Sequence, residues 1–293
     1  MKPASFELIR PETVEDAVAF KSGYGADASV LAGGQSLVPM LNFRLARPAA
    51  LVDLGAVPGL DGIRLEDGLI HVGAMVRQTA LEQSEVAVAA CPLLREALHH
   101  VAHPVIRNRG TVGGTIAHAD ASAELPTVLV ALHGSVVAAG PQGSRTVSAR
   151  ELFDFHLTTS LEPDEILTEV RFPALARGAG GAFVEVARRH GDYALAGVCA
   201  IVELDDDSRI GAARLAYSGV AATPVEATEA AAVLVGEPPG DAVFAEAGER
   251  ATGCVDVIDE EQASIAYRKQ LVRTLTRRAL AEASHRASTS RGA

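Results

Sequence analysis

The spacing of apolar positions predicts three successive folding units along the chain. In the first unit, the pattern indicates strands at 6–9, 28–32 and 50–54, with helices at 13–22 and 36–45 between them. Thr13 followed by Asp16 is typical of a helix N-terminus, because the hydroxyl accepts a hydrogen bond from a free backbone N–H group. The segment 1–57 is therefore predicted to form a compact βαβαβ-like unit.

The second unit is predicted to span 58–176 and to combine hairpins with helices. Asp67-Gly68 separates two apolar runs and favours a hairpin turn, since both residue types accept a positive φ at low cost. The remaining pattern indicates helices at 79–82 and 92–101, paired strands at 135–139 and 145–147, and a closing strand at 165–172. Gly and Ala are frequent in 173–181, which is the linker candidate.

The third unit is predicted to span 177–287. Its strands come before its helices, which indicates a separate α+β domain. Strand-like runs at 182–188, 196–204 and 209–218 predict a three-stranded antiparallel sheet. Helices are expected at 225–235, 241–254 and 262–284, and the small polar residues of 288–293 predict a disordered tail.

Composition excludes several classes of protein. The formal net charge of −11 argues against a nucleic-acid-binding surface, because phosphate backbones are held by clustered Lys and Arg. No apolar run approaches the roughly 20 residues of a membrane helix, and 1–10 lacks the order of a signal peptide, so we expect a cytoplasmic protein. Cys91, Cys199 and Cys254 lie far apart in the sequence, so no local pair is available for zinc or an iron-sulfur cluster.

Two glycine pairs are the strongest chemical signal. Gly33-Gly34 and Gly113-Gly114 each lie between an apolar run and a hydroxyl residue, so backbone N–H groups can turn toward an anion without a Cβ in the way. Neither pair has the GxGxxG spacing, and GxxxxGK[ST] is absent, which argues against a Rossmann NAD site and a P-loop. The loops therefore predict a ligand with two phosphates or a long polar linker, held from two sides.

Four segments, in this order, carry a resemblance to a known family. The chain resembles the medium, flavin-binding subunit of molybdenum hydroxylases, the xanthine dehydrogenase and carbon monoxide dehydrogenase family. The two glycine segments resemble its first and second FAD loops, and the likeness continues toward the C-terminus over nearly the whole chain. The matching segments are Ala32-Gly33-Gly34-Gln35-Ser36-Leu37-Val38-Pro39-Met40 with 44–48, 107–120 with Glu124-Leu125-Pro126, 188–197 and 267–280.

The resemblance implies an α+β fold of the vanillyl-alcohol-oxidase (PCMH) type, in which two α/β subdomains sandwich FAD and a C-terminal α+β domain closes over it. It implies that Asp120 accepts a hydrogen bond from a ribose or ribityl hydroxyl, and that Leu161 and Tyr193 lie near the flavin ring. A turn cap is the alternative role for Asp120, and a buried core tyrosine for Tyr193. The implied FAD-binding residues are Ala32, Gly33, Gly34, Gln35, Ser36, Leu37, Thr111, Gly113, Gly114, Thr115, His118, Asp120, Leu161 and Tyr193.

The sequence departs from the family pattern at two positions. Gln35 stands where many relatives have His, so a histidyl-flavin bond cannot form and non-covalent FAD is expected. Ala121 stands where many relatives have Pro, so a looser turn is expected there. Gly114→Val is expected to lower FAD occupancy, because a β-branched residue neither approaches a phosphate closely nor takes a positive φ.

By resemblance, the chain is the electron-transfer subunit of an oxidoreductase. A large partner subunit would hydroxylate the substrate on molybdopterin cytosine dinucleotide, a small subunit would carry two [2Fe-2S] clusters, and FAD here would deliver electrons to an external acceptor. The expected assembly is a dimer of heterotrimers, a heterohexamer, with no catalytic or metal-binding residue in this chain. The alternatives are a stand-alone FAD-dependent oxidoreductase of the same fold, which needs its own substrate pocket, and a binding protein without a cofactor.

Two clusters of charged or titratable residues have competing interpretations. His99-His100-x-x-His103, with His118 and Asp120, could supply metal ligands, but neighbouring helical histidines point in different directions and the metal interpretation is disfavoured. The basic residues of the last helix are either contacts to partner subunits or a solvated face. They are Arg268, Lys269, Arg273, Arg277 and Arg278.

Overall fold

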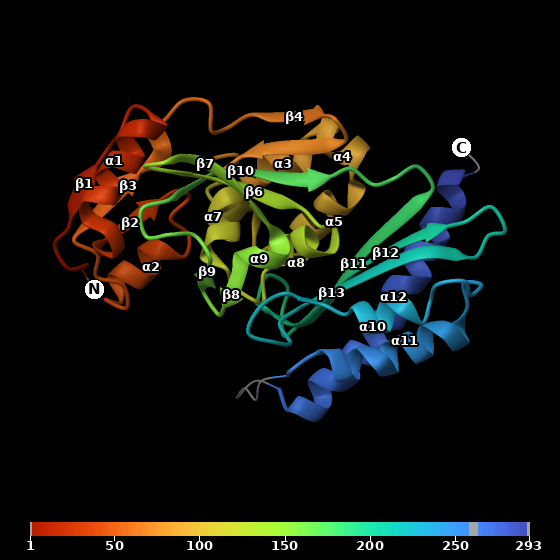
Figure 1. Ribbon diagram of the computed structural model, residues 1–293. Coiled ribbons are helices and arrows are strands. Elements are labelled where there is room, and N and C mark those ends of the chain that lie inside the picture. The colour runs from red at the N-terminus through yellow and green to blue at the C-terminus, as the bar shows by residue number, and fades with distance from the viewer. Residues whose placement is uncertain (1, 258–262, 292–293) are drawn as a thin grey trace.

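The computed structural model describes residues 2–257 and 263–291 and places the N-terminal unit at one end of the molecule (Figure 1). This unit is a parallel sheet in the order β1-β3-β2, as its alternating strands and helices predict. Thr13 caps the first helix, accepting a hydrogen bond from the Asp16 N–H at 3.0 Å. The elements are β1 (Glu7–Ile9), α1 (Val14–Tyr24), η1 (Gly25–Asp27), β2 (Ala28–Leu31), α2 (Leu37–Asn42), β3 (Ala50–Asp53) and η2 (Leu54–Ala56).

The second unit is built on a five-stranded antiparallel sheet in the order β4-β5-β10-β6-β7. Asp67 and Gly68 have φ of 50° and 75°, which confirms the predicted hairpin turn. The elements are β4 (Ile63–Glu66), β5 (Leu69–Gly73), α3 (Gln78–Gln83), α4 (Glu85–Ala90), α5 (Pro92–His100), α6 (Pro104–Arg107), α7 (Val112–His118), α8 (Glu124–Ala131), β6 (Ser135–Gly140), β7 (Gly143–Ser148), α9 (Ala149–Leu152), β8 (Phe153–Phe155), β9 (Thr158–Thr159) and β10 (Ile166–Pro173).

The C-terminal unit contains the three predicted antiparallel strands, together with a short fourth strand. Helix α12 packs against β11, β12 and α11, so it covers the sheet from one side (Figure 1). The elements are β11 (Ala179–Ala187), β12 (Ala194–Leu204), β13 (Ile210–Ser218), β14 (Val225–Glu226), α10 (Thr228–Ala232), α11 (Asp241–Cys254) and α12 (Ile265–Arg291).

Two predictions for this unit are wrong in part. The helix predicted at 225–235 begins instead as strand β14, because Val225 and Glu226 pair with β13, and the helix that follows is shorter. The tail predicted at 288–293 is helical as far as Arg291. Within this helical part, the Ser288 hydroxyl donates to the His285 carbonyl at 2.7 Å. Gln262, 292 and 293, which also belong to these predictions, lie outside the described residues.

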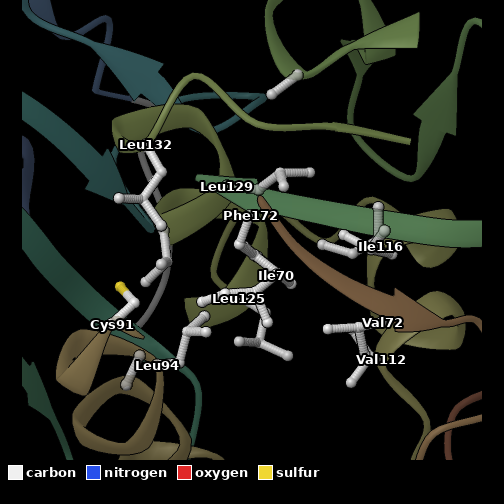
Figure 2. Close-up of a cluster of buried hydrophobic side chains, with 14 of the residues drawn as sticks. Ile70, Val72, Cys91, Leu94, Val112, Ile116, Leu125, Leu129, Leu132 and Phe172 are labelled. Carbon is white, nitrogen blue, oxygen red and sulfur yellow. The ribbon is translucent and has the colours of Figure 1, made fainter. Parts of the chain in front are cut away.

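The main hydrophobic core lies between the five-stranded sheet and helices α5, α7 and α8. Figure 2 shows side chains of all these elements turned toward one another: Ile70, Val72, Leu94, Val112, Ile116, Leu125, Leu129 and Phe172. The same cluster includes residues of the C-terminal sheet, among them Phe183, Cys199 and Ala216. Each predicted unit thus holds one main sheet, but the second and third units share a core, and the exact domain boundaries stay a prediction.

Candidate functional site

A cavity of about 640 Å³ is lined by residues from all three units. It brings together every residue that the sequence predicted for FAD binding: Ala32, Gly33, Gly34, Gln35, Ser36, Leu37, Thr111, Gly113, Gly114, Thr115, His118, Asp120, Leu161 and Tyr193. Segments far apart in the chain therefore converge on one site. That these residues contact FAD stays a prediction.

The first glycine loop leaves the carboxyl end of β2 and enters α2, and Gly34 has a φ of 72°. Within the described part of the chain, no acceptor is paired with the backbone N–H groups of 33–37. The next amide, that of Val38, donates to the Gly34 carbonyl at 3.0 Å. Successive free N–H groups around a left-handed residue form a concavity that suits an anion.

The second glycine loop is the first turn of α7, and its backbone N–H groups are already bound. The amide of Gly113 donates to the Ala74 carbonyl at 2.9 Å, and that of Gly114 to the Thr111 hydroxyl at 3.1 Å. Val112 and Thr115 donate to carbonyl groups of Val76 and Thr111. The expectation that these amides turn toward an anion is therefore wrong, and the loop offers the cavity its side-chain hydroxyls instead.

The two loops approach each other too closely for larger residues. A Cβ at position 33 would collide with the Arg109 carbonyl oxygen and lie 2.8 Å from Gly110 Cα. A Cβ at position 113 would lie 2.5 Å from the Cβ of Ala74, which continues from β5. Glycine is thus required here for close backbone packing. The free amides and the glycine-walled cradle fit the pyrophosphate of a dinucleotide.

The cavity wall contains acidic residues but, among the described residues, no lysine or arginine. Glu165 accepts from the Arg145 guanidinium at 2.6 Å and 2.8 Å, and this bond holds the pKa of Glu165 below its usual value. Asp192 pairs with Arg189 at 3.1 Å. An anionic ligand must therefore be held mainly by backbone N–H groups rather than by side-chain cations.

The remaining predicted residues of the cavity wall differ in burial. Tyr193 is 68% exposed, which excludes the alternative of a core tyrosine. Asp120 accepts a hydrogen bond from the Ser122 N–H at 2.8 Å, so it caps its own turn while lining the cavity. Burial lowers the pKa of His118. The turn after Asp120 is not loose, because Ala121 is buried and its carbonyl accepts from Gly219 at 2.8 Å.

The histidine cluster has separate carboxylate partners. His99 lies 3.1 Å from Glu82, and His100 lies 3.4 Å from Glu185, which confirms that neighbouring histidines point in different directions. Within 2–257 and 263–291, no group of three or more His, Cys, Asp or Glu side chains is placed to hold a metal ion. His99 and His100 therefore each contact a carboxylate of their own rather than a shared metal ion.

The basic residues of α12 also differ in their surroundings. Arg268 is buried and donates to the Leu195 carbonyl at 3.0 Å, and Arg273 pairs with Glu249. Neither the partner-contact nor the solvated-face interpretation holds for Arg268. Arg277 and Arg278 are exposed.

Sequence reasoning missed several residues of the cavity wall. Gln78, at the start of α3, is 4% exposed, and its Oε1 has no hydrogen-bond partner in the part of the chain that is described. Glu124 is 9% exposed, and burial together with the charge of Glu185 raises its pKa to about 8. Gln78 lies in no motif, and Glu124 follows the second loop in the family-like segment without a role being assigned to it.

The comparisons with known proteins define the class, a flavoprotein with an FAD-binding domain and a C-terminal domain. Residues 4–175 match the family described as the FAD binding domain in molybdopterin dehydrogenase, and residues 181–283 match the CO dehydrogenase flavoprotein C-terminal domain. The chain belongs to this family of flavin-binding medium subunits.

Known proteins of similar length support the assignment. The chain is 44% identical to subunit alpha of the 6-hydroxypseudooxynicotine dehydrogenase complex of Paenarthrobacter nicotinovorans, over 98% of this chain and 97% of the relative. It is 35% identical to the carbon monoxide dehydrogenase medium chain of Hydrogenophaga pseudoflava, over 96% of this chain and 97% of that relative. A solved carbon monoxide dehydrogenase from that organism, lacking the Mo-pyranopterin moiety of its molybdenum cofactor, superimposes with a TM-score of 0.94 at 36% identity, over 98% and 99%.

These likenesses confirm the predicted family, fold class and cofactor. The chain is an FAD-binding subunit of an oxidoreductase of the carbon monoxide and xanthine dehydrogenase type, and its function is electron transfer. None of the helices in the described residues is both long and apolar enough to cross a membrane.

Proposed function

We propose that FAD binds non-covalently in the cavity, with its pyrophosphate held by the free backbone N–H groups of 33–37. The observation that carries the proposal is this run of unpaired amides on a cavity wall without lysine or arginine in the described residues. Thr111 and Thr115 face the same ligand from the second loop, and Leu161 and Tyr193 line the part assigned to the flavin ring. Bound FAD supplies reversible redox chemistry, while the chain binds and orients it.

We further propose that the chain works in the cytoplasm as the medium subunit of a dimer of heterotrimers. Its partners would be a large subunit with molybdopterin cytosine dinucleotide and a small subunit with two [2Fe-2S] clusters, and its FAD would pass electrons to an external acceptor. Matches along almost the full length of medium chains and dehydrogenase-complex subunits support this assembly. Exposed Arg277 and Arg278 on α12 remain available for partner contacts.

Purification of the chain from its native host tests both proposals. We expect a yellow complex in which FAD, molybdenum and iron copurify with this chain and two further subunits. A chain that carries FAD but neither molybdenum nor iron would be a stand-alone oxidoreductase of the same fold. A native preparation without any flavin would contradict the FAD site itself.

A further inference from the structure

Glu124 stands out among the acidic residues that line the cavity. It begins α8, is 9% exposed, and forms no salt bridge with any residue of the described chain. Glu165 and Asp192 on the same wall each pair with an arginine, whereas Glu124 has only a backbone hydrogen bond, as Asp120 does. A buried carboxylate without a cation is costly, so its environment favours the neutral acid.

The nearest charged groups on the surrounding elements strengthen that preference. The side chain of Glu185 on β11 is buried; its Oε1 lies 3.4 Å from Nδ1 of His100 at the end of α5, and its Oε2 has no hydrogen-bond partner among the described residues. Burial and then the negative charge of Glu185 raise the pKa of Glu124 to about 8. A hydrogen bond to its own backbone N–H and the charge of Arg107 on α6 lower that pKa, whereas Asp120 raises it, so the raised value is what remains after these opposing effects.

Arg107 does not neutralise Glu124 directly. Its guanidinium donates to Glu82 of α3 at 3.0 Å and to the carbonyl of Val101, which follows α5, at 2.9 Å, so it is already bound. Tyr193 lines the same cavity; partial desolvation of its ring, which is 68% exposed, and then the negative charges of Asp120 and Glu124 raise the pKa of the phenol. The phenol therefore stays neutral over the range in which Glu124 titrates.

The ligand itself makes the charge of Glu124 matter. A dinucleotide brings a pyrophosphate, which is anionic, into a cavity whose described wall has no lysine or arginine. An ionised Glu124 adds repulsion in a partly buried site, where charges interact more strongly than in water. A neutral Glu124 removes that repulsion and adds an O–H donor.

We propose that Glu124 is a positioning residue that accompanies bound FAD as a neutral carboxylic acid, its O–H group donating a hydrogen bond into the cavity. Ionisation of this group opposes FAD binding. Binding is therefore coupled to proton uptake once the pH exceeds the range in which the free site is protonated. The inference rests on the proposed function, since it requires FAD to be the ligand.

The test uses the complex isolated from its native host and freed of FAD, titrated with FAD between about pH 6 and pH 9. Below about pH 8 the acid is already neutral, so affinity is constant and no proton is taken up. Above that pH the affinity falls about tenfold per pH unit, because one proton must be bound with each FAD. Calorimetry in buffers of different ionisation enthalpy counts this proton directly and needs no variant.

Three substitutions locate the proton. Glu124→Gln keeps a neutral side chain of similar volume, so affinity at neutral pH is retained and the fall at high pH disappears. Glu185→Gln removes the negative neighbour, so the fall begins at a lower pH. Glu165→Gln is the matched control on the same wall; Arg145 keeps that carboxylate ionised throughout, so the wild-type pH dependence remains.

Two results overturn the inference while leaving the FAD site in place. They are FAD binding without proton uptake above about pH 8, and an unchanged pH dependence in Glu124→Gln. The second result would mean that another group takes up the proton, for example His100, whose pKa is raised by its hydrogen bond with Glu185. Failure of FAD to bind at any pH would instead overturn the proposed function, and with it this inference.

Discussion

The two glycine loops look alike in the sequence but differ in the hydrogen bonding of their backbone N–H groups. In the first loop, the amides of 33–37 have no acceptor among the described residues. In the second, the amides of Gly113 and Gly114 bind Ala74 and Thr111, and so belong to the scaffold. The first loop leaves its backbone N–H groups unpaired toward the described chain, and the second uses its N–H groups to hold the wall of the cavity together.

The difference teaches that a glycine pair can serve two purposes. Gly34 supplies a left-handed residue, with φ of 72°, that turns successive amides in one direction. Gly113 supplies space, because a Cβ there would lie 2.5 Å from the Cβ of Ala74. Substitutions that add volume or remove a hydrogen bond should therefore affect FAD binding and folding in different proportions at the two loops.

The largest effect is expected for Gly33→Val. The added carbon atoms meet the Arg109 carbonyl and Gly110 Cα, which are backbone and cannot rotate away. Overpacking of this kind costs about 1–3 kcal/mol, so FAD affinity should fall roughly ten- to hundredfold if the bound state needs both loops in place. Flavin fluorescence titration of the FAD-free complex measures the change.

Gly23→Ala is the matched control, because a Cβ at position 23 in α1 meets no atom within 4 Å. Its FAD affinity should equal that of the wild type. Equal affinity in Gly33→Val as well would contradict the close approach of the two loops.

A smaller loss is expected for Gly114→Val. The physical reason differs from the one that the sequence offered, since Gly114 has no positive φ and its N–H is already bound. A Cβ there lies 2.6 Å from the Thr111 hydroxyl, which is part of a movable side chain and gives way at the expense of the cap. FAD affinity should fall about tenfold, together with thermal stability; loss of affinity without any loss of stability would argue against this mechanism.

The smallest effect is expected for Thr111→Val. Valine keeps the shape but cannot accept the Gly114 N–H, so the N-terminus of α7 loses its cap at a cost of about 1 kcal/mol. Differential scanning calorimetry should show Tm lowered by about 2–4 °C. Thr111→Ser retains the acceptor oxygen and should stay close to the wild type; an equal loss in both variants would exclude the cap as the cause.

Local signals were enough to predict much of the fold. Thr13 and Asp16 mark the start of α1, and Asp67-Gly68 marks the β4–β5 turn, because the deciding contacts lie within a few residues. Strand β14 was missed since it depends on pairing with β13, which no local pattern reveals.

The candidate site shows the same limit. Its residues were found through the glycine pairs and the family likeness, and the structure brings them to one cavity. The bound amides of Val112 and Gly113 could not be foreseen, because their acceptors Val76 and Ala74 come from a distant segment that continues from β5. The acceptor of the Gly114 amide, the Thr111 hydroxyl, is local. Gln78 belongs to no motif, so only its position in the folded chain connects it with the site.

The main core, part of which is drawn in Figure 2, contains residues from both sides of the boundary between the two matched families, one ending at 175 and the other beginning at 181. Phe183 and Cys199 from the C-terminal side are buried in the same cluster as Ile70 and Phe172. Recombination at this seam would leave each fragment with an apolar face exposed to water. We therefore expect the two matched regions to unfold together, because each buries apolar surface of the other.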